Sequence, residues 1–151
     1  MERGESGTMI PTYQDGEMIL KLYDQYESER MRAAKAWFAQ ELNGPERVNP
    51  AEFWEKFPRG SEGFTHFVTL YGFFEMVGVL HKNGLIHPDL LFDMWYINGF
   101  YDKMYPVIAD WRSQGDIHIA ENFERLAIAE RDWIGKKKGA AYVPQVSYLT
   151  E

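Results

Sequence analysis

A chain of 151 residues, 45% of them hydrophobic, is long enough to bury one continuous core and too apolar to be a disordered protein. Its formal net charge of −7 argues against duplex DNA or RNA as the main partner, because phosphate binding normally needs a basic surface. The chain has no cysteine, which excludes disulfides, thiolate catalysis and thiolate-bound zinc or iron–sulfur clusters.

The N-terminal residues lack the basic start and apolar run of a signal peptide. The most apolar stretch, residues 64–80, is interrupted by polar side chains and falls short of a membrane-spanning helix. We therefore expect a cytoplasmic protein with no membrane contact. Residues 1–12 are predicted to be a flexible segment, residues 13–138 a single helical domain and residues 139–151 an extended or flexible tail, either loose or docked along a groove.

Apolar residues recur at three- and four-residue steps from residue 14 to residue 42 and predict one long amphipathic helix. The run Asn43-Gly44-Pro45 is expected to end it, because proline cannot continue a helix and glycine accepts a left-handed cap. Asn49-Pro50 then has the pattern of a helix N-terminus and predicts a short helix that ends at Pro58.

Residues 62–83 form the most apolar predicted helix, and Ser61 is placed to cap its first turn. This segment has almost no polar face, which predicts a central helix packed on several sides. Gly84 is expected to end it. The predicted fold is all-α, a compact bundle of five or six helices around this central helix.

Three further signals follow the central helix. His87-Pro88 predicts the start of the next helix, with Met94 on its inner side, and Asn98-Gly99 predicts a break or a kink before a segment that Pro106 should bend. The last helix is predicted over about residues 117–137. No pattern typical of paired strands precedes the tail.

Glu75 stands in an apolar run where a carboxylate is hard to expose. Because burying an unpaired carboxylate is costly, Glu75 should pair with a cation, accept several hydrogen bonds or be protonated. The structural interpretation is an ion pair that fixes helix packing. The functional interpretation is a carboxylate that lines a polar pocket. The candidate cations are Arg30, Arg112 and Arg131.

Gly72 and Gly78 lie inside the predicted central helix. Glycine there costs about 1 kcal/mol relative to alanine, so each glycine should have a reason. We expect them to let another helix approach closely, with contact to a ligand as the alternative.

No motif predicts a metal, a cofactor or a catalytic residue. The four histidines are scattered, and neither Glu-x-x-His nor His-Glu-x-x-His occurs. The serines and threonines lack a context that would supply a base and an oxyanion hole. We therefore expect a protein that is not an enzyme.

Residues 95–106 are unusually rich in aromatic rings. Core packing at a helical corner is one explanation, and a partner-binding surface is the other, because Trp, Tyr and Met are enriched where partners dock. We predict a combination, with one side buried and one displayed. The candidate binding residues are Glu75, Tyr71, Trp95, Tyr96, Tyr101 and Tyr105.

One stretch of the chain reads Phe73-Phe74-Glu75-Met76-Val77-Gly78-Val79-Leu80-His81-Lys82-Asn83-Gly84-Leu85-Ile86, and Asp89-Leu90-Leu91-Phe92 follow it. This stretch resembles a bacterial family catalogued as domain of unknown function 4760. Members share paired aromatic residues, an acidic residue, an apolar stretch, a basic residue and Gly-Leu. The resemblance covers about residues 60–113 and implies a small helical domain. It implies no reaction, ligand or catalytic residue.

Two functional hypotheses follow. The first is a non-enzymatic protein–protein interaction or regulatory domain that uses the aromatic segment, the tail or both, with a protein partner or self-association. The second is a small-molecule-binding protein or enzyme with a pocket around Glu75 and the nearby aromatic residues. Mimicry of nucleic acid by an acidic surface is less favoured, because acidic and basic residues are interleaved.

Overall fold

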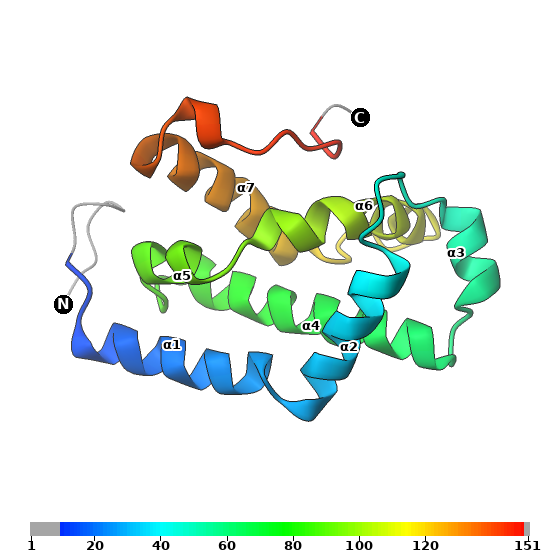
Figure 1. The fold of residues 1–151 in the computed structure, drawn as a ribbon, viewed down its shortest axis with the longest axis horizontal. Coiled ribbons are helices and arrows are strands. Elements are labelled where there is room, and N and C mark those ends of the chain that lie inside the picture. Colours follow the sequence, from blue (N-terminus) through cyan, green and yellow to red (C-terminus); the bar gives the residue numbers. More distant parts are fainter. Residues whose placement is uncertain (1–9, 150–151) are drawn as a thin grey trace.

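The computed structural model describes residues 10–149, and within that range helices are its regular secondary structure (Figure 1). The central helix α4 packs mainly against α7 and α2, and α6 packs against α7. This arrangement confirms the predicted all-α bundle around a central apolar helix. Residues 1–9, most of the predicted flexible segment, lie outside the described range. The elements are α1 (Tyr13–Tyr26), α2 (Glu29–Glu41), α3 (Pro50–Lys56), α4 (Glu62–Lys82), α5 (Pro88–Met94), α6 (Ile97–Ser113), α7 (Glu121–Lys137) and the 3-10 turn η1 (Ala140–Tyr142).

The prediction of one helix over residues 14–42 is wrong, because the chain breaks between α1 and α2. Ser28 has an extended backbone, and its Oγ accepts a hydrogen bond from the Met31 N–H at 3.3 Å, which makes it the N-cap of α2. The apolar periodicity runs across this break and so does not reveal it. The split accounts for seven α-helices in residues 10–149 where five or six were expected.

Several predicted helix ends are confirmed. The side chains of Asn49, Ser61 and His87 each accept a backbone hydrogen bond from the first turn of the following helix. Gly84 follows α4 with a φ of +73°, the left-handed conformation that glycine adopts most readily. These signals succeed because each involves residues only a few positions apart.

The core is organised by α4, whose Phe67, Leu70 and Phe74 side chains are fully buried. Among the described residues, α4 is also the one helix long and apolar enough to cross a membrane by length and composition. The core helix of a helical bundle meets the same criteria, and α4 packs against α2 and α7.

The contact between α4 and α7 is very close at Gly78. A Cβ atom added there would lie 2.3 Å from the Asn122 carbonyl oxygen, so the predicted close helix approach is confirmed at this glycine. At Gly72, by contrast, an added Cβ would meet nothing within 4 Å. The start of α7 differs from the prediction, because Ala120 takes a left-handed conformation (φ 60°) and delays the helix from residue 117 to Glu121.

The C-terminal tail is docked along α6 and α7 (Figure 1). The Arg131 Nε–H donates to the Pro144 carbonyl oxygen at 3.2 Å, and the Ser147 N–H donates to Asp102 Oδ1 at 2.8 Å. Tyr148 is buried, and its hydroxyl donates to Asn98 Oδ1. Of the two arrangements the sequence left open, the structure has the docked one for residues up to 149.

Candidate functional site

The aromatic segment begins where the chain passes from α5 to α6 through two residues with extended backbone, Trp95 and Tyr96. The predicted break at Asn98-Gly99 is wrong, because both residues belong to the first turn of α6. Gly99 instead makes room for a ring: a Cβ added there would lie 2.7 Å from Tyr96 Cδ2. Trp95 is buried, whereas Tyr96 is 53% exposed.

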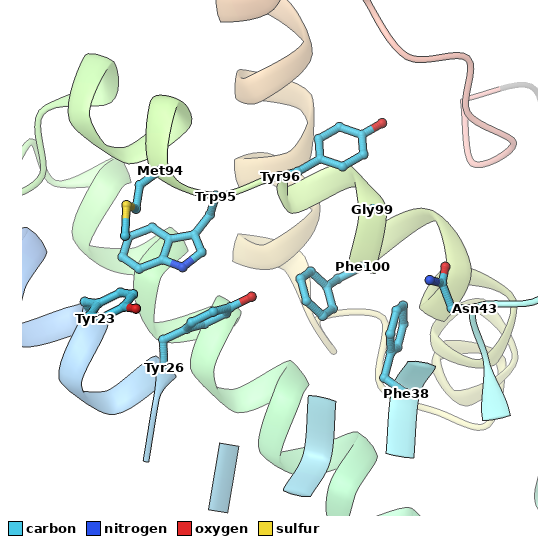
Figure 2. A pocket seen from close by; sticks show the side chains of 9 residues that line it. All are labelled: Tyr23, Tyr26, Phe38, Asn43, Met94, Trp95, Tyr96, Gly99 and Phe100. Atoms are coloured by element: carbon cyan, nitrogen blue, oxygen red, sulfur yellow. The ribbon is translucent and has the colours of Figure 1, made fainter. Parts of the chain in front are cut away.

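An open cavity of about 430 Å³ lies at this junction, and we call it the aromatic cavity (Figure 2). It brings together the end of α1, the end of α2 and the α5–α6 junction. Of the six predicted binding residues, Trp95 and Tyr96 line it. The complete lining is Tyr23, Tyr26, Phe38, Asn43, Met94, Trp95, Tyr96, Gly99 and Phe100.

The walls of the aromatic cavity are held by ring-to-ring contacts. The ring centroid of Tyr26 lies 5.5 Å from that of Trp95, and the centroids of Phe38 and Phe100 are 4.9 Å apart. On its other side, Phe100 packs against Phe74 of the central helix, with the two ring centroids 4.8 Å apart. The Lys35 Nζ sits 3.5 Å from the Tyr26 centroid, a cation–π contact that further restrains this ring. These contacts hold the cavity walls in place.

The aromatic cavity carries hydrogen-bonding groups but no charge of its own. None of its lining residues, all within the described range, is acidic or basic. Burial and, to a smaller extent, the charge of Glu27 raise the pKa of Tyr26. Burial and, to a smaller extent, the charge of Glu130 raise the pKa of Tyr96. Both hydroxyls therefore stay protonated at neutral pH and can donate hydrogen bonds. This lining suits an apolar or aromatic group with a polar edge, and it holds no nucleophile with an adjacent base.

Glu75 lies away from the aromatic cavity and caps a helix. Of the three outcomes expected for Glu75, the structure has several hydrogen bonds rather than an ion pair with Arg30, Arg112 or Arg131. The carboxylate accepts hydrogen bonds from Asn122 N–H (3.1 Å), Phe123 N–H (2.9 Å) and Asn122 Nδ2 (2.8 Å). These donors open the first turn of α7, which has no side-chain cap of its own.

Two of the predicted arginine partners are used elsewhere. Arg112 pairs with Glu124 at 3.0 Å, and Arg131 binds the tail. Tyr71, the neighbour of Glu75 in the predicted pocket, is half-buried with its ring 5.9 Å from that of Trp111. Burial, followed by the charge of Glu75, raises the pKa of Tyr71.

Tyr101 and Tyr105 lie in a third place, under the tail. Tyr101 is fully buried, and its hydroxyl donates to Glu124 Oε1 at 2.7 Å. Its ring is 4.8 Å from that of Tyr148, and half-buried Tyr105 is 5.9 Å from both rings. Burial and, to a smaller extent, the hydrogen bond to Glu124 raise the pKa of Tyr101. These contacts hold the tail against α6 and place both tyrosines apart from the aromatic cavity.

The sequence analysis missed Glu130, a carboxylate only 1% exposed. It accepts hydrogen bonds from Ile97 N–H (2.8 Å), Asn98 N–H (2.8 Å) and Asn98 Nδ2 (2.7 Å), so it caps α6 from α7. Burial raises the pKa of Glu130, and these donors lower it only in part. Helical spacing could have revealed this residue, since Glu130 follows Leu126 by four positions on the apolar face of α7.

The sequence also left most of the cavity lining unassigned. Tyr23, Tyr26 and Phe38 belong to the apolar stripe of the first predicted helix, but they line one cavity with the α5–α6 junction only because the chain breaks at Ser28 between α1 and α2. Met94, predicted to face inward, is 46% exposed at the rim. No group of three or more His, Asp or Glu side chains that could hold a metal occurs within residues 10–149.

Comparison with known proteins identifies the family. A family model described as Domain of unknown function (DUF4760) matches residues 11–133, and the chain belongs to this family. The match extends beyond the stretch of residues 60–113 that carries the sequence resemblance and includes every residue that lines the aromatic cavity. No curated protein and no solved structure matches the chain.

Proposed function

We propose that this member of the DUF4760 family is a non-enzymatic protein-interaction domain whose aromatic cavity receives an apolar side chain of a protein partner in the cytoplasm. The observation that carries the proposal is the open, uncharged cavity of about 430 Å³ between α1, α2 and the α5–α6 junction. Burial of a large anchor residue in such a pocket is the usual source of hot-spot binding energy.

The surface around the aromatic cavity supports a partner larger than a single side chain. Met94 and Tyr96 form an exposed rim, and a second opening of about 350 Å³ lies farther along α1, beside Leu20 and Leu90. Leu20 lies three residues before Tyr23, and Leu90 lies four residues before Met94, so residues of the two openings lie on one face of α1 and of α5. An amphipathic segment that lay along this face would reach both openings.

Site-specific photocrosslinking in the source cells tests the proposal. A photoreactive phenylalanine analogue at Met94 is expected to form a protein adduct of defined mass. The same analogue at Ile117, exposed beyond the opposite end of α6 about 25 Å away, should form none. Tyr96→Ala in the Met94 variant should lower the adduct yield severalfold while circular dichroism stays unchanged. Equal adducts at both positions, or none at Met94, would argue against the proposal.

A small aromatic molecule is the second candidate ligand, because the cavity volume lies within the range of ligand pockets. The aromatic cavity takes the place of the pocket predicted around Glu75, because the Glu75 carboxylate is hydrogen-bonded to the start of α7. Native mass spectrometry of freshly purified protein distinguishes the two candidates. A stoichiometric small-molecule adduct that Tyr96→Ala removes would favour this alternative over a protein partner.

A further inference from the structure

The docked tail touches two of the segments that line the aromatic cavity. The N–H and the Oγ of Ser147 both donate to Asp102 Oδ1 of α6, at 2.8 and 3.0 Å. From the loop between α2 and α3, Arg47 Nη1 donates to Ser147 Oγ at 3.1 Å. Asn43, which lines the cavity, lies at the start of the same loop. One tail residue therefore joins α6 to the loop that carries Asn43.

A neighbouring contact ties this loop directly to α6. Lys103 Nζ donates to the Gly44 carbonyl oxygen at 2.7 Å, and Gly44 follows Asn43 in the chain. On the cavity side, α6 supplies Gly99 and Phe100, which line the cavity together with Asn43 (Figure 2). The tail, the loop and α6 therefore form one hydrogen-bonded unit that includes part of the cavity wall.

A buried chain of hydrogen bonds, which we call the tail relay, runs from Tyr148 to the first turn of α6. The Tyr148 hydroxyl donates to Asn98 Oδ1, and Asn98 Nδ2 donates to Glu130 Oε1 at 2.7 Å. Glu130 in turn accepts hydrogen bonds from the N–H groups of Ile97 and Asn98, each at 2.8 Å. Asn98 and Glu130 are each 1% exposed, so solvent does not replace a lost partner. Removing one member of the tail relay therefore leaves a buried polar group unpaired.

The tail relay ends beside the rim of the aromatic cavity. Tyr96 is the N-cap residue of α6, and its side chain makes no capping hydrogen bond. The N–H groups of Ile97 and Asn98 are capped by Glu130 instead. Gly99 lies against the Tyr96 ring, since a Cβ added to this glycine would be 2.7 Å from Tyr96 Cδ2. A looser first turn would therefore release the Tyr96 ring from its place at the cavity.

We infer that the docked tail regulates the aromatic cavity, so that docking of the tail and binding in the cavity stabilise each other. Both depend on the same arrangement of the first turn of α6, and a coupling of this kind is reciprocal. Within residues 139–149, the described part of the tail, Tyr148 is the one buried residue, so docking depends mainly on its ring and hydroxyl. The inference rests on the proposed function for what binds in the cavity, whereas the coupling itself does not.

Amide hydrogen exchange of the full chain, followed by NMR, tests the tail relay without any ligand. Tyr148→Phe removes the hydroxyl and keeps the ring, and it leaves Asn98 Oδ1 without this donor. The amides of Ile97 and Asn98 should then exchange about tenfold faster, relative to the Leu70 amide in the core of α4. Tyr142→Phe is the matched control, because it removes a hydroxyl from an exposed ring of the same tail and should change neither rate. Equal acceleration at Ile97 and Leu70 would mean only a loss of global stability and would overturn the inference.

Fluorine NMR of protein labelled with 3-fluorotyrosine tests whether the effect reaches the cavity. The signal of Tyr96 is assigned by its disappearance in Tyr96→Phe. Tyr148→Phe should shift or broaden this signal, because the first turn of α6 holds the Tyr96 ring, and Tyr142→Phe should leave it in place. A Tyr96 signal that is the same in wild type and Tyr148→Phe would contradict coupling between the tail and the cavity.

The Met94 photocrosslink then tests the consequence for binding. At equal protein levels, Tyr148→Phe should lower the adduct yield severalfold, whereas Tyr142→Phe should leave it unchanged. An adduct yield that Tyr148→Phe does not alter would show that the tail does not regulate binding. If wild type forms no adduct at Met94, the proposed function fails, and the exchange and fluorine measurements still decide whether the tail and the cavity are coupled.

Discussion

At the scale of single residues, two carboxylates act as helix caps supplied from another helix. Glu75 of α4 accepts hydrogen bonds from N–H groups in the first turn of α7, and Glu130 of α7 accepts hydrogen bonds from N–H groups in the first turn of α6. Neither α6 nor α7 has a side-chain cap of its own, so each carboxylate satisfies donors that would otherwise be unpaired. Asn98 extends the second cap, because it donates to Glu130 and accepts from the Tyr148 hydroxyl.

The stability that depends on Glu130 should vary with pH. Because the pKa of Glu130 is raised in the folded protein, the folded state holds this proton to higher pH than the unfolded state does. The linked stability is then fully present below the unfolded pKa and is lost as the pH rises through the folded pKa. The free energy of unfolding of wild type minus that of Glu130→Gln should therefore be larger at pH 4 than at pH 8, as measured by urea denaturation. A difference that grows toward pH 8 would contradict the raised pKa.

At the scale of elements, the position of α7 depends on how closely it approaches α4. Gly78 removes the Cβ that would collide with the Asn122 carbonyl, and Glu75, three residues earlier, binds the same turn of α7. Close packing and capping therefore act together at one point. A helix set slightly farther away would lose the hydrogen bonds as well as the contact.

Gly78→Ala should lower the free energy of unfolding by about 1–3 kcal/mol, because the added methyl group must displace backbone atoms of α7. Gly72→Ala on the same helix is the control and should raise it by up to about 1 kcal/mol through helix propensity, since its Cβ meets nothing. Urea denaturation at low protein concentration measures both without a contribution from self-association. Equal effects of the two substitutions would show that the α4–α7 contact is looser than described.

At the scale of the whole molecule, the tail closes the bundle over α6. Tyr148 packs its ring on Tyr101, and the Ser147 N–H binds Asp102. The tail thereby covers tyrosines that α6 and α7 alone would leave more exposed. The aromatic cavity stays open within the described part of the chain, which is why it carries the proposed function.

Tyr148→Ala should lower the free energy of unfolding by about 3 kcal/mol, because it removes a buried ring and leaves Asn98 without a donor. Tyr142→Ala is the control: this ring is 73% exposed, and its loss should change the stability by less than about 0.5 kcal/mol. Thermal and urea denaturation followed by circular dichroism would measure both. A stability unchanged by Tyr148→Ala would mean that the tail contributes nothing to the folded core.

The sequence by itself determined the helical class, the central helix and the caps at Asn49, Ser61 and His87, because these depend on periodicity or on bonds between residues two or three positions apart. Only the tertiary structure decided the roles of Glu75 and Glu130, whose partners lie 47 and 32 residues away along the chain. The aromatic cavity likewise joins α1, α2 and the α5–α6 junction, segments that no local pattern relates. Such pairings arise from how the helices pack, and helix packing depends on the shape of the whole core.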